Sequence, residues 1–326
     1  MASLSNLIVQ KGSTILITGV NDFLGLHIAD QFLEHGYKKY GEGHFELFKI
    51  ADLTAEGAFE KAAKGTSVIV HTASITKFSA DLNAVIPQAI AFARNALESA
   101  YKEASVKRFV LTSSSSAAIL SVLGGPGIKV TEGCWNEFAI KAAWADTPYT
   151  QERGGIVYAV SKTEDEQTVW KYHKENRNRR PDLVINAVLP SFNFGKSLDS
   201  VNQGHPSSSA LPAALWQGEV IPFHHVISHW FPEYYIDVQD TGRLHVAAAV
   251  FDHVKDRRTF SFAERFSWDN VLDILRKTAP NKEFPNNFSA GSDPNDIKPR
   301  DEAEQLLRDL GRPGWVSLED SILANF

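Results

Sequence analysis

Short apolar runs that alternate with helix-like segments are the feature that most limits what this chain can fold into. Runs of β-branched and aliphatic residues with no polar alternation suit strands that are buried on both faces. They occupy residues 14–18, 68–73, 108–112 and 183–189. Helical patterns between them cover residues 25–35, 87–103 and 157–176. This alternation predicts an α/β fold with a Rossmann-like, doubly wound parallel sheet.

The character of the sequence changes after Pro190. Residues 195–235 are rich in Pro, Ser, His and aromatic residues and carry only short periodic runs. The patterns that follow predict a strand at residues 258–262 and helices at residues 238–251, 268–278 and 301–310. We therefore expect a main α/β domain over residues 1–190 and a small mixed lobe over residues 191–326, with residues 236–262 returning to the main domain.

Charge and cysteine content exclude several classes of protein. The net charge of -6 and the lack of a basic stripe argue against a nucleic acid or an anionic membrane as partner. A single cysteine, Cys134, rules out an internal disulfide and indicates a reducing compartment. Residues 1–10 are too short and polar for a signal peptide, and no run reaches the roughly 18 apolar residues of a membrane span. A cytoplasmic protein is predicted.

A glycine-rich turn follows the first predicted strand and opens the first predicted helix: Thr18-Gly19-Val20-Asn21-Asp22-Phe23-Leu24-Gly25. Such a turn lets the backbone approach a pyrophosphate, whose charge is stabilised at the helix N-terminus. Turns of this kind also use glycine for steric reasons alone. Asp22 stands at the middle glycine of this pattern. Its carboxylate either repels the pyrophosphate, or points outward or caps the helix.

Tyr158 and Lys162 are four residues apart in a helical pattern, so both side chains are expected on one face. The ammonium group there favours the phenolate, which makes the tyrosine a usable general acid. The alternative is a helix tyrosine beside a solvated lysine. The strand at residues 108–112 runs straight into the serines at residues 113–116, at a strand end where ligands bind. One of these serines can hydrogen-bond a substrate carbonyl oxygen while Tyr158 delivers the proton; otherwise the run is a polar turn.

In these motifs the chain resembles the extended short-chain dehydrogenases/reductases, and among them the fungal NADPH-dependent aldehyde and ketone reductases of the aldehyde reductase II type. The similarity runs from about residue 13 to residue 324. Besides the glycine turn, the segments that carry it are Val70-His-Thr-Ala-Ser74, Val106-Lys-Arg-Phe-Val-Leu-Thr-Ser-Ser114, Tyr158-Ala-Val-Ser-Lys-Thr-Glu164, Val188-Leu-Pro190, Tyr234-Tyr235 and Gly311-Arg-Pro-Gly-Trp315. The resemblance implies hydride transfer from NADPH to a carbonyl carbon, with residues 1–190 binding NAD(P) and residues 191–326 mainly the substrate.

The resemblance also implies roles for single residues. The catalytic set is Ser114, Tyr158, Lys162 and Asn95, with Ser115 as the alternative serine. Lys162 would also hold the hydroxyls of the nicotinamide ribose, Pro190 would line the nicotinamide, and Asp52 and Leu53 would lie by the adenine. The full set expected to bind the cofactor is Gly19, Asn21, Phe23, Leu24, Gly25, Asp52, Leu53, Thr72, Ala73, Ser74, Tyr158, Lys162 and Pro190.

Aromatic residues are the candidates for an apolar substrate pocket. The residues predicted to line it are Phe78, Ser115, Phe192, Trp216, Phe223 and Tyr234. Aromatic residues in a small lobe also commonly form its core, and this alternative stays open. His224, His225 and His229 include two imidazoles at helical spacing, but no metalloprotease glutamate follows and no cysteine lies nearby, so no metal is predicted.

One segment departs from the family pattern. After the first helix, the family has a second strand, a basic residue for the 2′-phosphate and a further helix. Here residues 36–44 lead directly to Phe45-Glu-Leu-Phe-Lys-Ile50, which matches the third strand, so that roughly 20 residues are absent, including the residue that reads the adenosine ribose. Lys38 and Lys39 are the basic groups that remain nearby. We expect residues 45–50 to move next to the first strand, because an unpaired strand inside a sheet loses hydrogen bonds worth ~1 kcal/mol each.

Three functions follow from these features. The first is reduction of an aldehyde, ketone or keto ester, with NADPH as cofactor or NADH as the alternative. The protein would be a monomer or homodimer whose only predicted partner is the small carbonyl substrate. The second is a nucleotide-sugar epimerase or dehydratase, which shares the serine, tyrosine and lysine. The third is a degenerate reductase that binds its cofactor poorly, as Asp22 and the missing segment suggest.

Overall fold

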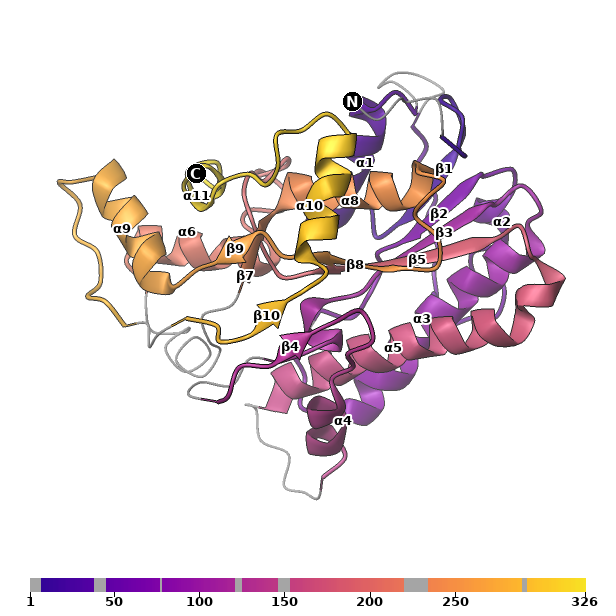
Figure 1. Ribbon diagram of the computed structural model, residues 1–326, viewed down its shortest axis with the longest axis horizontal. Coiled ribbons are helices and arrows are strands. Elements are labelled where there is room, and N and C mark those ends of the chain that lie inside the picture. Colours follow the sequence, from indigo (N-terminus) through magenta and orange to yellow (C-terminus); the bar gives the residue numbers. More distant parts are fainter. Residues whose placement is uncertain are drawn as a thin grey trace.

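The computed structural model describes residues 7–37, 45–76, 78–120, 125–145, 153–219, 234–288 and 292–326. Its centre is a parallel sheet in the order β1-β2-β3-β5-β8, drawn in Figure 1. The strands are β1 (Ile15–Thr18), β2 (Val68–His71), β3 (Arg108–Thr112), β5 (Val184–Pro190) and β8 (Arg258–Ser261). Each predicted apolar run therefore forms a strand, and the predicted α/β fold class is confirmed.

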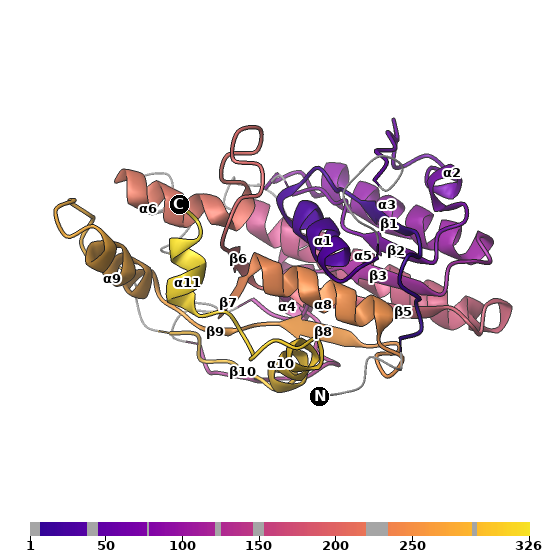
Figure 2. The ribbon, with the colours of Figure 1, turned by 90° about the horizontal axis from the view of Figure 1, so that it is seen from above.

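Helices cover both faces of this sheet, as Figures 1 and 2 show. One face packs against α3 (Leu82–Lys102) and α5 (Gly154–Asn176), and the short α2 (Glu60–Ala63) and α4 (Glu137–Ala143) lie against these two helices. The other face packs against α1 (Phe23–Glu34), α8 (Val238–Val250) and α10 (Arg300–Asp309). Alternate residues of each strand enter the two cores: Ile69 faces α3, whereas Val68 and Val70 face α1 and α8.

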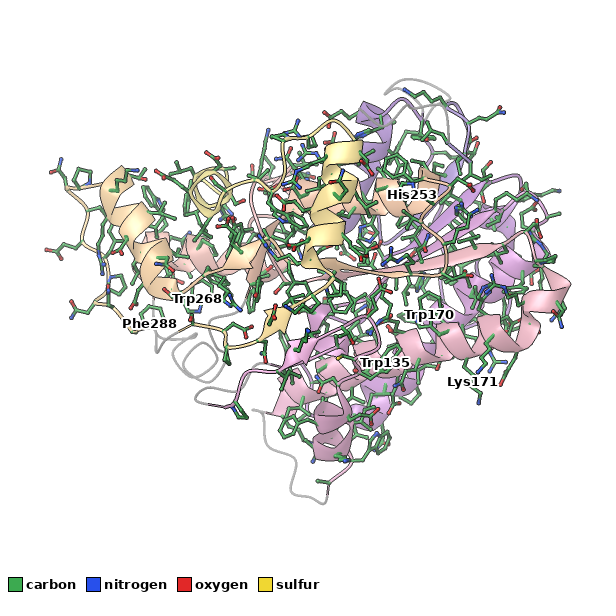
Figure 3. All side chains as sticks on the ribbon, viewed as in Figure 1. Trp135, Trp170, Lys171, His253, Trp268 and Phe288 are labelled. Atoms are coloured by element: carbon green, nitrogen blue, oxygen red, sulfur yellow. The ribbon has the colours of Figure 1, made fainter. Side chains whose placement is uncertain are left out.

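A smaller lobe extends from the carboxyl ends of the strands. Its sheet has the order β6-β7-β9, with β6 (Phe192–Phe194) parallel to β7 (Tyr234–Asp237) and β9 (Glu264–Arg265) antiparallel to it. The helices α6 (Ala210–Gln217), α9 (Trp268–Thr278) and α11 (Leu318–Leu323) surround this sheet, and β4 (Lys129–Val130) pairs with β10 (Asp296–Ile297) beside it. Trp268 and Phe288, labelled in Figure 3, lie in this lobe.

Local capping explains where two helices begin. The predicted limits of α9 are confirmed, because Ser267 and Asn270 form a reciprocal capping box at its N-terminus. The predicted start of α3 at Pro87 is wrong. Asp81 accepts hydrogen bonds from the N–H groups of Asn83 and Ala84, so the helix starts at Leu82 and holds Pro87 inside it.

The first strand lies at an open edge of the sheet. β1 pairs with β2 alone among the described residues, and residues 45–50 form no strand. The expected move of this segment next to β1 is therefore wrong. Phe45, Leu47 and Phe48 are 44%, 73% and 41% exposed. These three apolar side chains are therefore not buried against the sheet, and a strand in this position would be stabilised by such burial. Lys38 and Lys39 lie outside the described residues.

Candidate active site

The carboxyl ends of the parallel strands meet at one edge of the sheet. In register, Thr18 of β1 lies opposite His71 of β2, and Thr112 of β3 lies opposite Val188 of β5. β5 runs almost directly into β6, which places this edge beside the lobe. Ligands of open α/β sheets bind outside such an edge. The segments that follow β1, β2, β3 and β5 all carry predicted site residues.

Two glycines shape the turn after β1. Gly19 has a φ of 66°, which favours glycine, and a Cβ atom there would lie 2.9 Å from the backbone nitrogen of Ala73. A Cβ atom at Gly25 would lie 2.1 Å from the carbonyl oxygen of Gly19. Both positions therefore exclude a side chain. The turn can therefore pack tightly between α1 and the end of β2. As at any helix N-terminus, the first N–H groups of α1 have no acceptor within the helix itself.

The hydroxyl of Thr18 joins this turn to the end of β2. Its Oγ1 accepts hydrogen bonds from the backbone N–H groups of Thr72 at 3.0 Å and Ala73 at 3.1 Å. The same hydroxyl lies 3.0 Å from Nδ1 of His71. Burial, together with the charge of Lys162, lowers the pKa of His71 to about 3, so the ring is neutral and its Nδ1 accepts the Thr18 proton. Thr72 and Ala73, both predicted cofactor residues, are thus held against Gly19.

Asp22 occupies the N-cap position of α1 but does not cap the helix. Its side chain makes no capping hydrogen bond, although its backbone has the extended geometry of a cap residue. The side chain is exposed, and the neighbouring protein removes enough of its hydration to raise the pKa of the carboxyl. The first-turn amides of α1 are therefore left for another acceptor, with a carboxyl group beside them.

A loop of the lobe contacts the glycine turn, which the sequence did not predict. The side-chain amide of Gln203 donates to the carbonyl oxygen of Asn21 at 2.7 Å. The carbonyl oxygen of Lys196 accepts from Nε2 of His27 at 2.8 Å. These residues lie in the Ser- and Pro-rich stretch, where no periodic pattern gave a signal. The loop forms one wall of the space outside the turn.

Three buried side-chain oxygen atoms in these segments have no partner in the described part of the chain. They are Oγ of Ser74, Oγ of Ser197 and Oε1 of Gln203. A buried polar atom without a hydrogen bond costs about 1–3 kcal/mol. A polar ligand bound outside the turn would supply the missing partners, so these residues fit a dinucleotide there.

Asn95 acts on the loop after residue 50 rather than on the serine and tyrosine. Its Nδ2 donates to the carbonyl oxygens of Leu53 at 3.0 Å and Ala55 at 2.9 Å. Within the same loop, Asp52 accepts hydrogen bonds from the backbone and hydroxyl of Thr54, and these lower the pKa of its carboxyl. Asn95 therefore holds the predicted adenine segment against α3, and the catalytic role that the resemblance implied stays a prediction.

The serines after β3 divide into structural and available hydroxyls. Ser113 donates to Oε2 of Glu166 at 2.7 Å. Glu166 is buried and forms a two-pronged ion pair with Arg258 of β8, at 2.7 and 3.1 Å. Trp135 and Trp170, labelled in Figure 3, complete this cluster: the Arg258 guanidinium lies 4.0 Å from the centre of the Trp135 ring, and Trp170 donates to Glu166. Ser113 is thus part of the scaffold.

Ser114 is arranged differently. Its Oγ accepts hydrogen bonds from the backbone N–H of Ser116 at 3.2 Å and from the Ser116 hydroxyl at 2.9 Å. Both bonds use its lone pairs, so its own proton is free to be donated. The short 3₁₀ helix η2 (Ser115–Ala117) that follows packs against α5. Hydrogen bonding therefore favours Ser114 over Ser113 as the donor to a substrate, and Ser115 lies buried beside it.

Helix α5 carries Tyr158, Lys162 and Asp165 along one face. Nζ of Lys162 donates to the carbonyl oxygen of Thr112 at 2.9 Å, which joins α5 to the end of β3. Oδ2 of Asp165 lies 3.7 Å from the same ammonium group, and both side chains are buried. Burial raises the pKa of Asp165 to about 7 against the attraction of Lys162. The sequence predicted the first two residues of this row but not Asp165.

A chain of hydroxyls beneath the site fixes Thr112. Its Oγ1 lies 2.9 Å from Oγ1 of Thr72 and 2.8 Å from Nε2 of His245. Burial lowers the pKa of His245 to about 4, so the ring is neutral; its Nδ1 donates to the carbonyl oxygen of Thr241, and its Nε2 accepts from Thr112. The ends of β2 and β3 are therefore linked to α8 through uncharged groups.

One predicted aromatic residue lies directly at the site. The Phe78 ring is 5.5 Å from the Tyr158 ring, edge to face, and it is 54% exposed. The backbone of Phe78 also lies against Gly154, where a Cβ atom would come within 2.8 Å of the Phe78 carbonyl oxygen. Phe78 thus forms an apolar wall beside the tyrosine hydroxyl.

The other predicted pocket aromatics lie in packed surroundings of the lobe. Phe192 packs against Phe194, Phe266 and Trp268. Tyr234 is buried, and its hydroxyl donates to the carbonyl oxygen of Asn295 at 3.2 Å. The Trp216 ring lies 4.8 Å from Phe326 near the C-terminus. Phe223 and the three histidines at 224, 225 and 229 lie outside the described residues.

A pocket of about 410 Å³ lies between β9, β10 and the start of α10. Tyr234 and charged residues such as Arg265 and Asp296 line it, and Ser114, Tyr158 and Lys162 do not.

The described residues contain no group of three or more potential metal ligands. No helix among them is both long and apolar enough to cross a bilayer.

Comparison with known proteins agrees with this geometry. The model of the NAD dependent epimerase/dehydratase family matches residues 15–215. The chain belongs to this family. It is 36% identical to aldehyde reductase 2 of Sporidiobolus salmonicolor, over 99% of this chain and 97% of the relative. It is 32% identical to the ketoreductase nvfG of Aspergillus novofumigatus, over 96% of each. Its fold resembles that of the yeast methylglyoxal/isovaleraldehyde reductase Gre2 complexed with NADPH, with a TM-score of 0.78, 23% identity and coverage of 95% and 96%.

The same comparison bears on the shortened segment. The alignment with aldehyde reductase 2 spans 343 positions, whereas this chain has 326 residues, so at least 17 positions of the alignment hold no residue of this chain. This shortfall is similar in size to the segment predicted to be absent after Gly36. It is therefore consistent in size with a shortened segment in this chain, and within the described residues β1 has no neighbour on its outer side. The predicted family, fold class and oxidoreductase class are confirmed.

Proposed function

We propose that this chain reduces the carbonyl group of an aldehyde, ketone or keto ester, with NADPH as the reductant. The observation that carries the proposal is that Lys162, on the same face of α5 as Tyr158, is hydrogen-bonded to Thr112 at the end of β3, two residues before Ser114. Ser114 keeps a free proton to donate, and Lys162 is fixed to the end of β3. Relatives whose names describe aldehyde and ketone reduction support the same reaction.

The residues that would hold the cofactor follow the strand ends. The glycine turn at residues 19–25 would take the pyrophosphate, with the first N–H groups of α1 as donors. Asp52 and Leu53 would lie by the adenine, Ser74 would offer its unpaired hydroxyl, Lys162 would bind the ribose and Pro190 would line the nicotinamide. When bound, NADPH supplies the hydride.

The protein's part in the reaction is to polarise the carbonyl and to deliver a proton. The Ser114 hydroxyl donates a hydrogen bond to the carbonyl oxygen, which stabilises the charge that develops there. Tyr158 gives that oxygen its proton, and the Lys162 ammonium stabilises the phenolate that results. Phe78 and Ser115 would border the substrate, with the apolar ring of Phe78 favouring a carbonyl that carries hydrophobic groups. The predicted roles of Phe192, Trp216, Phe223 and Tyr234 at the pocket remain proposals.

Two other functions are distinguished by particular features. A nucleotide-sugar epimerase would need polar and basic groups for a nucleotide diphosphate in the lobe, whereas the described lobe around Phe192 is aromatic. A degenerate reductase would keep Tyr158 and Lys162 but fail to bind its cofactor, because β1 has no outer neighbour among the described residues and Asp22 stands beside the proposed pyrophosphate site.

Titration of the purified protein with NADPH and with NADH tests this proposal. Cofactor fluorescence and thermal stabilisation give the affinity, and simple ketones then test for turnover. Saturable binding of NADPH with turnover of a ketone is the expected result. If neither cofactor binds, both enzyme functions are wrong and the degenerate reductase is supported. If the cofactor binds and only a nucleotide sugar is converted, the epimerase is supported.

A further inference from the structure

The buried carboxyl of Asp165 is a charged group for which the proposed reaction has no role. It follows Lys162 by three residues on α5, and the two side chains are 4% and 5% exposed. Its Oδ2 lies 3.7 Å from Nζ of Lys162, which is too long for a hydrogen bond but close enough for a strong attraction. Its Oδ1 is buried without a partner among the described residues. A carboxyl so poorly satisfied is costly, and this points to a functional reason for its presence.

We infer that Asp165 is a positioning residue for the proton donor, which acts through Lys162 by holding the ammonium and offsetting the charge that it presents to Tyr158. The three residues lie at positions 158, 162 and 165 of one helix, so their side chains share one face of α5 and Lys162 comes between the other two along the helix. An ionised Asp165 disfavours the phenolate. It thereby keeps Tyr158 in the protonated form that carbonyl reduction needs. This role rests on the proposed function, but its physical basis does not require a bound cofactor.

The other charged and titratable groups around this row are already accounted for. Glu166, the next residue, is neutralised by Arg258 from β8. His71 of β2 and His245 of α8 are neutral because burial lowers the pKa of each ring. Asp165 is therefore the group in the described surroundings of Lys162 whose charge changes near neutral pH, since burial raises its pKa to about 7.

The direct test is the titration of the Tyr158 phenol without cofactor. The ultraviolet difference spectrum between the protein and its Tyr158→Phe variant isolates this phenol from the other tyrosines. The same pair of spectra is then recorded on an Asp165→Asn background. Removing one negative charge within about 10 Å should move the midpoint of phenolate formation to lower pH by about one unit. An unchanged midpoint would overturn the inference.

The matched control is Glu164→Gln. Glu164 is the neighbouring carboxylate of the same helix, only partly buried, and it accepts a hydrogen bond from Nε1 of Trp144 at 3.1 Å. The change removes one negative charge without touching Lys162, so the midpoint should stay within a few tenths of a unit. An equal shift in both variants would show a general charge effect and would contradict a specific role of Asp165. A third variant, Asp165→Ala, removes the shape of the side chain as well as its charge, and it should shift the midpoint as Asp165→Asn does, because the shift depends on the charge alone.

Turnover provides a second readout that separates this inference from the proposed function. If ketone reduction is observed, its loss at high pH should move to lower pH in Asp165→Asn by the same amount as the phenolate midpoint. If no ketone is reduced, the proposed function fails, yet the cofactor-free titration still decides whether Asp165 acts on Tyr158. If the phenolate midpoint shifted but the pH profile of the rate did not, Asp165 would have no role in the reaction.

Discussion

Nζ of Lys162 donates a hydrogen bond to the carbonyl oxygen of Thr112, 2.9 Å away, and this bond joins α5, which carries Tyr158, to the end of β3, two residues before Ser114. The hydroxyl of Thr112 is held in turn by Thr72 and His245. Tyr158, Lys162 and Ser114 are therefore placed by one connected set of buried groups. The predictions below separate residues that react from residues that hold these groups in place.

Ser114→Ala and Ser113→Ala should differ in their effect on kcat. Ser114→Ala removes the donor to the substrate oxygen and should lower kcat by about 10²–10³-fold. It also removes the acceptor of the Ser116 N–H and hydroxyl, so the free energy of unfolding should fall by about 1–3 kcal/mol as well. Ser113→Ala leaves the Glu166 carboxylate without one donor, and should lower the free energy of unfolding by about 1–3 kcal/mol while kcat changes much less. Steady-state kinetics and urea unfolding of both variants measure this contrast. A large loss of kcat in Ser113→Ala alone would show that the assignment of the donor to Ser114 is wrong.

Asn95→Ala should weaken cofactor binding more than it slows the reaction. The change leaves the carbonyl oxygens of Leu53 and Ala55 without their donor, so the loop that would lie by the adenine is no longer held to α3. We expect a rise of about tenfold in the Kd for NADPH, equivalent to about 1.4 kcal/mol, with kcat nearly unchanged. A loss of kcat with an unchanged Kd would support the catalytic role that the family resemblance implied.

Asp22→Gly should improve cofactor binding. Asp22 makes no capping hydrogen bond and places a carboxyl beside the first N–H groups of α1. Its removal should lower the Kd for NADPH several-fold, at a stability cost of a few tenths of a kcal/mol for the helix N-terminus. Fluorescence titration at two salt concentrations measures both the gain and its electrostatic origin, because added salt should reduce the gain. Weaker binding in this variant would show that Asp22 assists the cofactor.

Asp165→Asn should stabilise the protein in a pH-dependent way. The pKa of Asp165 in the folded protein, about 7, lies above its ordinary value of 3.8, so the folded state holds this proton more tightly than the unfolded state. Asp165 therefore lowers the free energy of unfolding by an increasing amount as the pH rises from about 4 to 7, and by a constant amount above pH 7. The variant should gain about 2–4 kcal/mol at pH 8 and nothing at pH 4. Urea unfolding at both values measures this; an equal difference at the two pH values would contradict it.

The sequence predicted the main sheet well because its strands carry a strong signal. Residues 108–112 and 183–189 are mostly apolar, without polar alternation, and lie between long helical patterns, so burial on both faces was the simplest explanation. Residues 45–50 are also rich in apolar residues, yet they form no strand. A strand needs a neighbour with which to exchange hydrogen bonds and a face to bury, and neither requirement is visible in a run of six residues.

Within the site, the sequence identified residue types but not their partners. It placed Tyr158 and Lys162 on one face of a helix, and a serine opposite them. The family resemblance named Ser114, with Ser115 as the alternative, but gave no physical reason. The reason that separates Ser113 from Ser114 is the hydrogen bond of Ser113 to Glu166, 53 residues away, which no local pattern shows. His245 and Gln203 gave no signal, because their roles arise from contacts across 133 and 182 residues. Aromatic content alone could not separate Phe78, which lies against Tyr158, from Phe192, which packs in the lobe.

The most direct test of this account compares the protein with its Tyr158→Phe variant in NADPH oxidation driven by a simple ketone. The account predicts turnover by the protein, and a loss of about 10²–10⁴-fold in kcat for the variant with an unchanged Kd for NADPH. Turnover that survives in Tyr158→Phe would contradict the assignment of Tyr158 as the proton donor.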